Sequence, residues 1–255
     1  MADVRLAHVS YNVGSAEILR DLDLSFRKGV FNAILGPNGA GKSTLMRIAA
    51  GRLAATSGEV LYAGVPIASL DSTALARRRA VLSQQSEMAF PLSVEDVVLM
   101  GRYPHYRAAP SPRDLEIVAE ALALVDMADR RHQAYPTLSG GERQKTHLAR
   151  VLAQIWDGGD CLLFLDEPTT SLDIHYQIQL LDTAKSFLAR GCTIVATLHD
   201  LSMAFDYGDR FYLMEKGSLV HESADPIPKE IIERVYRVRV VEDRDENRAR
   251  WRFRL

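Results

Sequence analysis

Cysteine is scarce in this sequence of 255 residues, which contains only Cys161 and Cys192. Each begins an apolar run, where a small buried thiol fits well, so we expect both to be reduced core residues and not a disulfide or metal ligands. No apolar run approaches the roughly 18 residues that cross a bilayer, and no apolar stretch follows basic residues at the N-terminus. The sequence therefore predicts a cytoplasmic protein without a membrane span of its own.

Excess charge is also lacking. Lys and Arg total 31 against 33 for Asp and Glu, a net charge of −2. Such a balance produces no long-range field that would gather nucleic acid or anionic lipid, so we expect no nucleic-acid partner. Hydrophobic residues make up 47% and charged residues 25% of the chain, which suits a globular protein with a sizeable core. We find neither an internal repeat nor a low-complexity segment.

The predicted secondary structure changes along the chain. Residues 3–35 alternate apolar and polar positions around turn signals at 12–15 and 28–29, which predicts short antiparallel strands, and 58–67 predicts another hairpin. Helical spacing occurs at 45–51, and an insert at about 86–150 contains predicted helices at 94–101 and 113–126. From residue 138, predicted helices at 140–156, 176–190 and 201–207 alternate with strands at 161–165 and 193–198. This alternation predicts a parallel sheet with helices on both faces.

The sharpest motif lies between a predicted strand and a predicted helix. It consists of Gly36, Pro37, Asn38, Gly39, Ala40, Gly41, Lys42, Ser43 and Thr44, and fits the pattern G-x-x-x-x-G-K-[ST]. Its glycines let backbone N–H groups surround phosphate oxygens at the positive end of the next helix. In this role Lys42 reaches the β- and γ-phosphates, and the Ser43 hydroxyl binds Mg²⁺. The alternative is a glycine-rich turn with a solvated lysine, but the flanking strand and helix favour a nucleotide site.

A second motif closes the apolar strand 161–165 with Asp166, Glu167 and Pro168. A carboxylate at the end of a buried strand is costly unless a metal ion or solvent meets it. We therefore expect Asp166 to hold Mg²⁺ and Glu167 to orient and polarise an attacking water. A helix N-cap is the structural alternative for this acidic pair.

Two weaker features gain weight from their position. Gln84 follows the strand-like residues 80–83, and His199 follows the strand 193–198. Because ligands of open parallel sheets bind at the carboxyl ends of the strands, Gly36, Asp166, Gln84 and His199 are expected at one edge. Taken alone, Gln84 or His199 would be interpreted as an ordinary solvated loop residue.

Leu138-Ser139-Gly140-Gly141-Glu142 gives the sequence its resemblance to the ABC ATPase family. Tyr11 is similar to the family's adenine-stacking aromatic residue, Gln84 to its Q-loop glutamine, residues 171–173 to its D-loop and His199 to its switch histidine. The resemblance implies ATP and Mg²⁺ as cofactors, with Glu167, His199 and Gln84 catalytic, and Ser43, Gln84 and Asp166 at the metal. It covers nearly the whole chain as one nucleotide-binding domain.

The resemblance also implies partners. Two such subunits close head to tail, so that ATP held by Lys42 of one is capped by Ser139, Gly140 and Gly141 of the other, with Asp173 nearby. The physics agrees, because a serine and two glycines opening a helix offer backbone donors to a γ-phosphate. The homodimer would work at the cytoplasmic face of the inner membrane, with a permease dimer and a periplasmic or surface substrate-binding protein.

Within the family, residues 98–105 and 149–156 are most similar to importers of iron chelates, and among these to haem-import ATPases. The sequence departs from that group at Tyr176, where relatives carry histidine, and at Lys145, where many carry arginine. We do not interpret Tyr103, His105 or His175 as haem ligands, because the substrate passes through the permease. We expect the segment 86–107 to contact the permease, since it combines apolar and aromatic residues with arginines. The residues in question are Met88, Phe90, Arg102, Tyr103, Tyr106 and Arg107.

Other functions remain open at this point. Import of a ferric siderophore or cobalamin, or an exporter with a separately encoded permease, would use the same ATPase. A soluble ABC protein acting on ribosomes or DNA would usually show two fused cassettes or a coiled-coil insert and a basic patch, and an adaptor without turnover would not need Glu167 and His199. The predicted fold is α/β, a P-loop (RecA-like) core with an antiparallel β subdomain and a helical insert subdomain.

Overall fold

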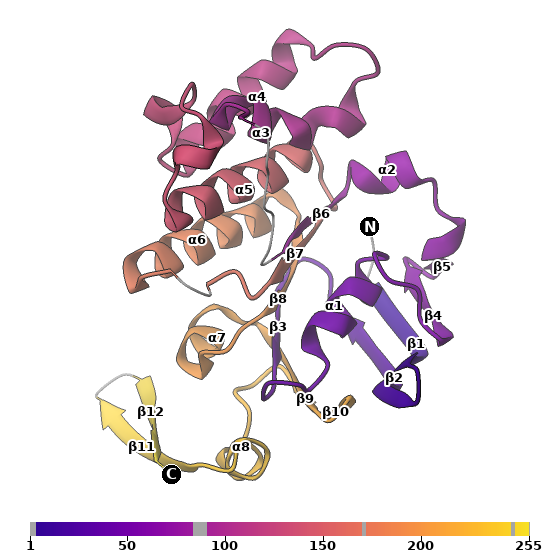
Figure 1. The fold of residues 1–255 in the computed structure, drawn as a ribbon. Helices are drawn as coiled ribbons and strands as arrows, with labels where there is room; N and C mark the ends of the chain where they lie inside the picture. Colours follow the sequence, from indigo (N-terminus) through magenta and orange to yellow (C-terminus); the bar gives the residue numbers. More distant parts are fainter. Residues whose placement is uncertain (1–3, 84–90, 170–171, 246–247, 255) are drawn as a thin grey trace. The chain divides into compact units, whose positions relative to one another are not determined.

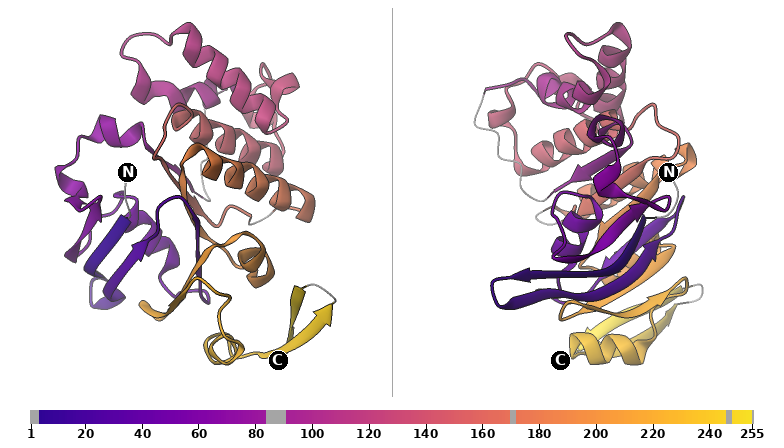
Figure 2. Two further views of the ribbon diagram at one scale, coloured as in Figure 1. Left: turned by 180° about the vertical axis from the view of Figure 1, so that it is seen from behind. Right: turned by 90° about the vertical axis from the view of Figure 1, so that its right-hand side faces the viewer.

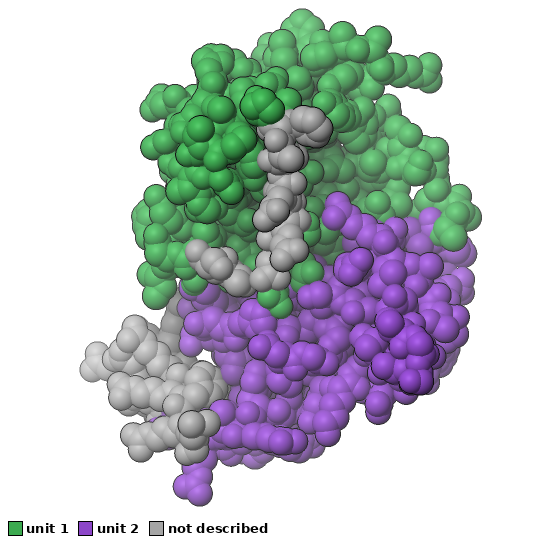
Figure 3. All heavy atoms as spheres, viewed as in Figure 1, with its two compact units in different colours: residues 1–2, 68–194 green, residues 3–67, 195–255 purple. Residues whose placement is uncertain are grey.

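The computed structural model describes residues 4–83, 91–169, 172–245 and 248–254. The chain forms two compact units (Figure 3). Unit 1 comprises residues 1–2 and 68–194, and unit 2 comprises residues 3–67 and 195–255. The boundary falls inside strand β8 (Thr193–Thr197).

Unit 2 contains an antiparallel sheet that the sequence predicted. Its strands are β1 (Val4–Val13), β2 (Ala16–Phe26), β4 (Ser57–Tyr62) and β5 (Val65–Pro66), in the order β2-β1-β4-β5. The long β1–β2 hairpin is seen at the indigo end of the ribbon (Figure 2). Its turn carries Gly14 at a φ of 58°, a conformation that glycine adopts without steric cost.

The parallel part of unit 2 carries the predicted phosphate loop. Strand β3 (Phe31–Leu35) pairs in parallel with β9 (Arg210–Glu215), which pairs antiparallel with β10 (Ser218–Ser223). Every residue of β3 is buried, which is typical of a strand covered on both faces. Helix α1 (Lys42–Ala49) follows β3 (Figure 1). It begins three residues before the predicted start, because Gly41 caps it in a left-handed conformation.

The C-terminal part of unit 2 begins with α7 (Leu201–Tyr207), which the sequence predicted. The elements after it were not assigned from the sequence: β9, β10, α8 (Lys229–Tyr236) and the hairpin of β11 (Arg239–Asp245) and β12 (Arg248–Arg254). The β9–β10 turn places Lys216 and Gly217 at φ values of 48° and 83°. Two positive φ values in a tight turn match the twist of the flanking strands.

Unit 1 pairs β6 (Arg79–Leu82) in parallel with β7 (Leu162–Asp166). Between these strands the chain is largely helical (Figure 1). Its helices are α3 (Val94–Leu99), the 3₁₀ helix η2 (Met100–His105), α4 (Pro112–Leu124), η3 (Ala128–Arg130), η4 (Tyr135–Thr137) and α5 (Gly140–Gln154). Short helices α2 (Ser72–Ala76) and η1 (Ile67–Ser69) precede β6, and α6 (Ile174–Ser186) and η5 (Phe187–Arg190) follow β7.

Three helices of this region begin with the same local device. Ser93, Ser111 and Ser139 each form a capping box with an acidic residue three positions later, at the starts of α3, α4 and α5. The serine oxygen accepts from the N3 backbone N–H, and the acidic side chain accepts from the N-cap N–H. These local sequences therefore specify where the helices begin.

Arg102 corrects an expectation about the segment 86–107. The side chain is only 3% exposed, and its guanidinium donates to Asp114 Oδ1 at 2.9 Å, Asp157 Oδ2 at 2.7 Å and the Ala153 carbonyl at 2.8 Å. Although burial alone would raise it, hydrogen bonds from Ser111 and Arg102 hold the pKa of Asp114 below its usual range. Arg102 thus joins η2, α4 and the end of α5, and is not available to a permease. Met88 and Phe90 lie outside the described residues.

The two cysteines are free and buried, as predicted. Both lie in unit 1, at residues that directly precede β7 and β8, and the Thr193 N–H donates to the Cys161 carbonyl at 2.7 Å. Among the described residues, no helix combines the length and apolar character that a membrane crossing requires.

Candidate nucleotide site

The predicted phosphate loop has the geometry that its sequence requires. It follows β3, contains left-handed backbone at Gly39 and Gly41, and leads directly into α1. Lys42 is 5% exposed, and its Nζ donates to the carbonyls of Gly36 at 2.8 Å and Pro37 at 3.1 Å. The ammonium group is therefore held inside the turn of the loop, beneath the N-terminal end of the helix.

Two glycines of the loop are required by contacts within unit 2. A Cβ at Gly36 would lie 2.3 Å from the Met214 carbonyl oxygen, and one at Gly41 would lie 2.7 Å from Leu19 Cδ2. Both distances are shorter than van der Waals contact, and both residues have positive φ values, of 146° and 98°. Glycine is thus needed at position 36 because the Met214 backbone approaches it closely, and at position 41 chiefly because of its positive φ, since the nearest atom there is the end of a leucine side chain.

Tyr236 supports the loop in a way that the sequence did not reveal. The Gly36 N–H donates to the Tyr236 Oη at 2.9 Å, across 200 positions of sequence. Burial raises the pKa of Tyr236 to about 12. No local pattern connects an aromatic residue of α8 to the first glycine of the loop, so this contact could only be found from the fold.

We expect Tyr236→Phe to lower the free energy of unfolding by about 1–3 kcal/mol, because the buried Gly36 N–H would lose its acceptor. The contribution of Tyr236 to the free energy of unfolding should decrease at high pH. The folded pKa lies above the unfolded value of about 10, so this tyrosine's contribution is complete below about pH 10 and is lost as the pH rises. Thermal unfolding should be measured at about pH 9 and about pH 11. The difference in the free energy of unfolding between wild type and variant should be smaller at the higher pH. An unchanged gap would contradict the assignment.

Two other predicted residues of unit 2, Tyr11 and His199, are connected to the phosphate loop through the strands that carry or precede them. Tyr11 is half-buried on β1 and pairs with Leu19 of β2, whose side chain lies against Gly41. His199 is exposed and directly follows Leu198, whose N–H donates to the Ile34 carbonyl of β3 at 3.1 Å. The residue after β8 is therefore hydrogen-bonded to the strand that leads into the phosphate loop. The remainder of the predicted shared edge, with Gln84 and Asp166, stays a prediction.

Unit 1 carries the acidic motif. Asp166 ends β7 and is half-buried, and Glu167 follows it with a φ of 49°. Leu82 of β6 is in register with Leu165 of β7. The predicted Gln84, two residues past Leu82, lies outside the described residues.

The signature motif lies at the start of α5. Ser139 is exposed, accepts from the Glu142 N–H at 3.4 Å and donates its hydroxyl to Glu142 Oε2 at 2.9 Å. Hydrogen bonds from the Ser139 backbone and side chain, with Arg130 nearby, lower the pKa of Glu142. Gly140 has no atom within 4 Å of where its Cβ would lie. Ser139 is thus an N-cap, with its own backbone N–H turned to Glu142 Oε2 at 2.8 Å.

Asp173 belongs to the same unit. It is exposed and caps α6, its side chain accepting from the Tyr176 N–H at 3.1 Å. This cap explains why α6 begins two residues before the predicted start. Ser171 lies outside the described residues. Unit 1 therefore contains Ser139, Gly140, Gly141, Asp166, Glu167 and Asp173, and unit 2 contains Tyr11, the phosphate loop and His199.

A family model described as ABC transporter matches residues 19–170, more than half of the chain. The chain belongs to the ABC transporter family. This confirms the resemblance carried by residues 138–142 and the predicted α/β fold class. An inward-facing metal-chelate type ABC transporter has a similar chain, with a TM-score of 0.82, 23% identity and coverage of 99% of this chain and 98% of that one. At that identity the likeness shows the fold.

Curated relatives share more of the sequence. The hemin import ATP-binding protein HmuV of Gloeobacter violaceus is 43% identical over 85% of this chain and 80% of its own. HmuV of Pseudomonas entomophila is 44% identical over 85% and 84%, and HmuV of Vibrio anguillarum is 38% identical over 92% and 91%. The bacterial ABC transporter cassette MJ0796, solved as a dimer, is 26% identical over 86% and 97%, with a TM-score of 0.74.

Proposed function

We propose that this ABC protein hydrolyses ATP to drive uptake of haem through a separate membrane permease. The observation that carries the proposal is the 38–44% identity, over most of the chain, to proteins named hemin import ATP-binding protein. The buried, loop-held Lys42 supports the ATP half of it. The same relatives favour haem over a siderophore, cobalamin or an exported substrate.

In this proposal the phosphate loop binds the triphosphate of ATP. Backbone N–H groups of residues 39–44 and the start of α1 surround the phosphates, and Lys42 exchanges its loop carbonyls for β- and γ-phosphate oxygens. Tyr11 stacks on the adenine. These groups bind and orient the nucleotide without taking part in bond breaking.

In this proposal the hydroxyl of Ser43, the carboxylate of Asp166 and the side-chain oxygen of Gln84 would supply the oxygen donors for Mg²⁺. When bound, Mg²⁺ supplies positive charge to the phosphate oxygens. In this proposal Glu167 accepts a proton from the attacking water, and His199 contacts the γ-phosphate. The donor set fits the ion because it contains only hard oxygen ligands.

One proposed protein partner is another copy of the chain. A head-to-tail dimer would bring Ser139 and the N–H groups of Gly140 and Gly141 to the ATP held by the opposite Lys42, with Asp173 at the interface. The exposure of Ser139 and Gly140, and the open space around Gly140, leave this helix start accessible to a phosphate. The bacterial ABC transporter cassette MJ0796, solved as a dimer, supports pairing of two copies.

The permease is proposed to contact a groove between α2 and η2 in unit 1. Tyr103, which is 57% exposed, Tyr106 and Arg107 line it from one side. Ser72, Thr73 and Arg77 line it from α2, and Arg77 Nε donates to the Pro104 carbonyl at 2.7 Å. Exposed aromatic residues beside arginines are enriched at protein interfaces. This surface replaces Arg102 as the permease contact, and would hold the ATPase at the cytoplasmic face of the membrane.

Reconstitution with a candidate haem permease tests both halves of this proposal, ATP hydrolysis and haem uptake. In vesicles containing both proteins and a substrate-binding protein, we expect haem to stimulate hydrolysis and a ferric siderophore or cobalamin not to. Tyr103→Ala with Arg107→Glu should abolish this stimulation and membrane association, since hot-spot aromatic and arginine residues carry most interface energy. Basal hydrolysis by the isolated subunit should stay near the wild-type rate.

Leu115→Ala is the matched control, because Leu115 is 45% exposed on α4 of the same unit but lies outside the groove. It should retain stimulation. Stimulation of hydrolysis by a siderophore but not by haem would refute the haem assignment. Stimulation by haem that is retained in the double variant would refute the proposed permease surface.

A further inference from the structure

The segment that follows Glu167 joins the two motifs of unit 1. Pro168 is next to Glu167, and Leu172 is next to Asp173, the N-cap of α6. The described residues of this segment, Pro168, Thr169 and Leu172, belong to no regular element. Their carbonyl groups therefore need hydrogen-bond donors other than a helix or a sheet.

Helix α5 supplies one of these donors. Gln144 lies one turn after the signature glycines, and its Nε2 donates to the Pro168 carbonyl at 3.2 Å. The helix that begins at the signature serine is thus bonded directly to the residue after Glu167. Gln144 is half-buried, which shields this contact from competing water.

Helix α6 supplies two more side-chain donations, and the Leu172 N–H also donates to the Thr169 carbonyl at 3.3 Å. The Nε2 of Gln177 donates to the Leu172 carbonyl at 2.8 Å and the Thr169 carbonyl at 3.2 Å. One side-chain amide therefore holds two points of the segment against the first turn of α6. With Gln144, three carbonyls of the segment bond to two glutamines.

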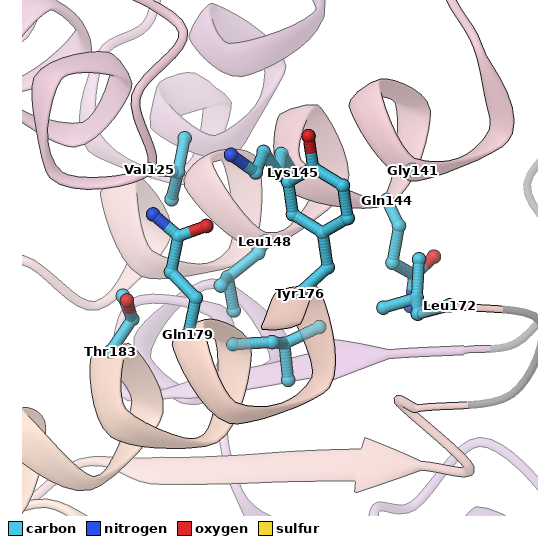
Figure 4. Close-up of a pocket in the computed structure, with 10 residues that line it drawn as sticks. Val125, Gly141, Gln144, Lys145, Leu148, Leu172, Tyr176, Gln179 and Thr183 are labelled. Carbon is cyan, nitrogen blue, oxygen red and sulfur yellow. The ribbon is translucent and has the colours of Figure 1, made fainter. Parts of the chain in front are cut away.

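Packing between α5 and α6 reinforces this arrangement (Figure 4). A Cβ at Gly141 would lie 3.8 Å from Leu172 Cδ2 and 3.9 Å from Tyr176 Cδ2. Lys145 Nζ lies 4.5 Å from the centre of the Tyr176 ring, a cation–π contact. Lys145 and Tyr176 therefore contact each other beside the segment.

Glu167 has a reason to need such support. Its φ of 49° is in the left-handed region, which costs a non-glycine residue about 1–2 kcal/mol. Such a conformation persists only where the surroundings enforce it. Hydrogen bonds to the carbonyls of Pro168, Thr169 and Leu172 restrict the backbone on the C-terminal side of Glu167.

We propose that Gln144 and Gln177 are positioning residues that hold Glu167 in its catalytic orientation and link it to the signature helix. The inference rests on the proposed role of Glu167 in ATP hydrolysis. Neither glutamine contacts nucleotide in this account, so each acts on the rate of the chemical step and not on ATP binding.

Gln144→Met and Gln177→Met test this with the full-length subunit and Mg-ATP. Methionine keeps the length of the side chain and removes the donor. We expect kcat to fall about tenfold or more in each variant, since small displacements of a reacting group are costly, with KM and the affinity for ATP unchanged. Two variants at separate positions keep the test valid if one of them folds poorly.

Gln154→Met is the matched control. Gln154 is also a half-buried glutamine of α5, and its Nε2 donates to two backbone carbonyls, of Ala76 at 2.7 Å and Arg79 at 2.9 Å. Its loss should cost similar stability but leave kcat near the wild-type value. Equal losses of kcat in all three variants would mean that the glutamines act only through folding, and would overturn the inference.

A double-mutant cycle separates this inference from the proposed function. In single-turnover hydrolysis, Gln177→Met should cause no further loss when added to Glu167→Gln, because a positioning residue has no effect once the group it positions is gone. An additional tenfold loss, or unchanged kcat in both single variants, would overturn the inference. Wild-type turnover by Glu167→Gln alone would instead refute the role of Glu167.

Discussion

Glu167→Gln should bind ATP with near wild-type affinity and hydrolyse it at least about a hundredfold more slowly, the scale of a lost general base. The amide keeps the size of the side chain and can still contact a water, but it does not accept the proton. Asp166 and the phosphate loop are untouched, so nucleotide binding has no reason to weaken.

A dimer that cannot hydrolyse its ATP should also persist. In size-exclusion chromatography with ATP and Mg²⁺, Glu167→Gln is expected to elute as a dimer under conditions where the wild type dimerises only transiently. Glu116→Gln is a useful control, because Glu116 is exposed on α4 and carries no predicted role in nucleotide binding or proton transfer. A monomeric Glu167→Gln with bound ATP would argue against closure of two subunits around the nucleotide.

Much of the site could be predicted because its signals are local. The phosphate loop needs glycine at 36 and 41 for positive φ and close contacts, and a lysine at the start of the helix, all within nine residues. The signature segment likewise specifies its own helix start through Ser139 and Glu142. Where a few adjacent residues determine backbone conformation, sequence patterns predict the local structure, and the roles of these residues stay predictions.

The failures come from contacts between residues far apart in the chain. Arg102 stands beside Tyr103 in a segment that resembles an exposed interface, yet its partners lie 12 and 55 positions away, and they bury it. Breaking one partner of a buried ion pair usually costs about 3–5 kcal/mol, so Arg102 is a folding residue. Tyr236 and Gly36 are separated still further.

The C-terminal elements were missed for a different reason. The Lys216-Gly217 pair resembles the turn signal that was used at 28–29, and could have predicted the β9–β10 hairpin. Helix α8 presents Tyr236 to the phosphate loop, but its sequence contains no nucleotide motif. Gln144 and Gln177 were hidden similarly, since a glutamine on a helix gives no sign of which backbone carbonyl it meets.

The proposed shared site predicts complementary defects in two variants. Lys42→Ala removes the cation that spans the β- and γ-phosphates, and should abolish hydrolysis and weaken ATP binding. Ser139→Arg places a bulky cation at the start of α5, and should leave ATP binding to the isolated subunit almost unchanged while eliminating hydrolysis. In the second variant the damaged site belongs to the opposite subunit.

A mixed dimer of the two variants contains one doubly damaged site and one intact site. The intact site combines Lys42 of the Ser139→Arg subunit with Ser139 of the Lys42→Ala subunit. With random pairing at equal amounts, half of the dimers are mixed, so about a quarter of the wild-type number of sites is intact.

Hydrolysis by this equimolar mixture, compared with each variant alone, is the most direct test of ATP turnover at a site shared by two copies of the chain. The account predicts activity in the mixture of up to about a quarter of the wild-type rate, with none in either variant alone. A mixture no more active than the mean of its two components would show that each subunit acts alone, and would contradict the shared site.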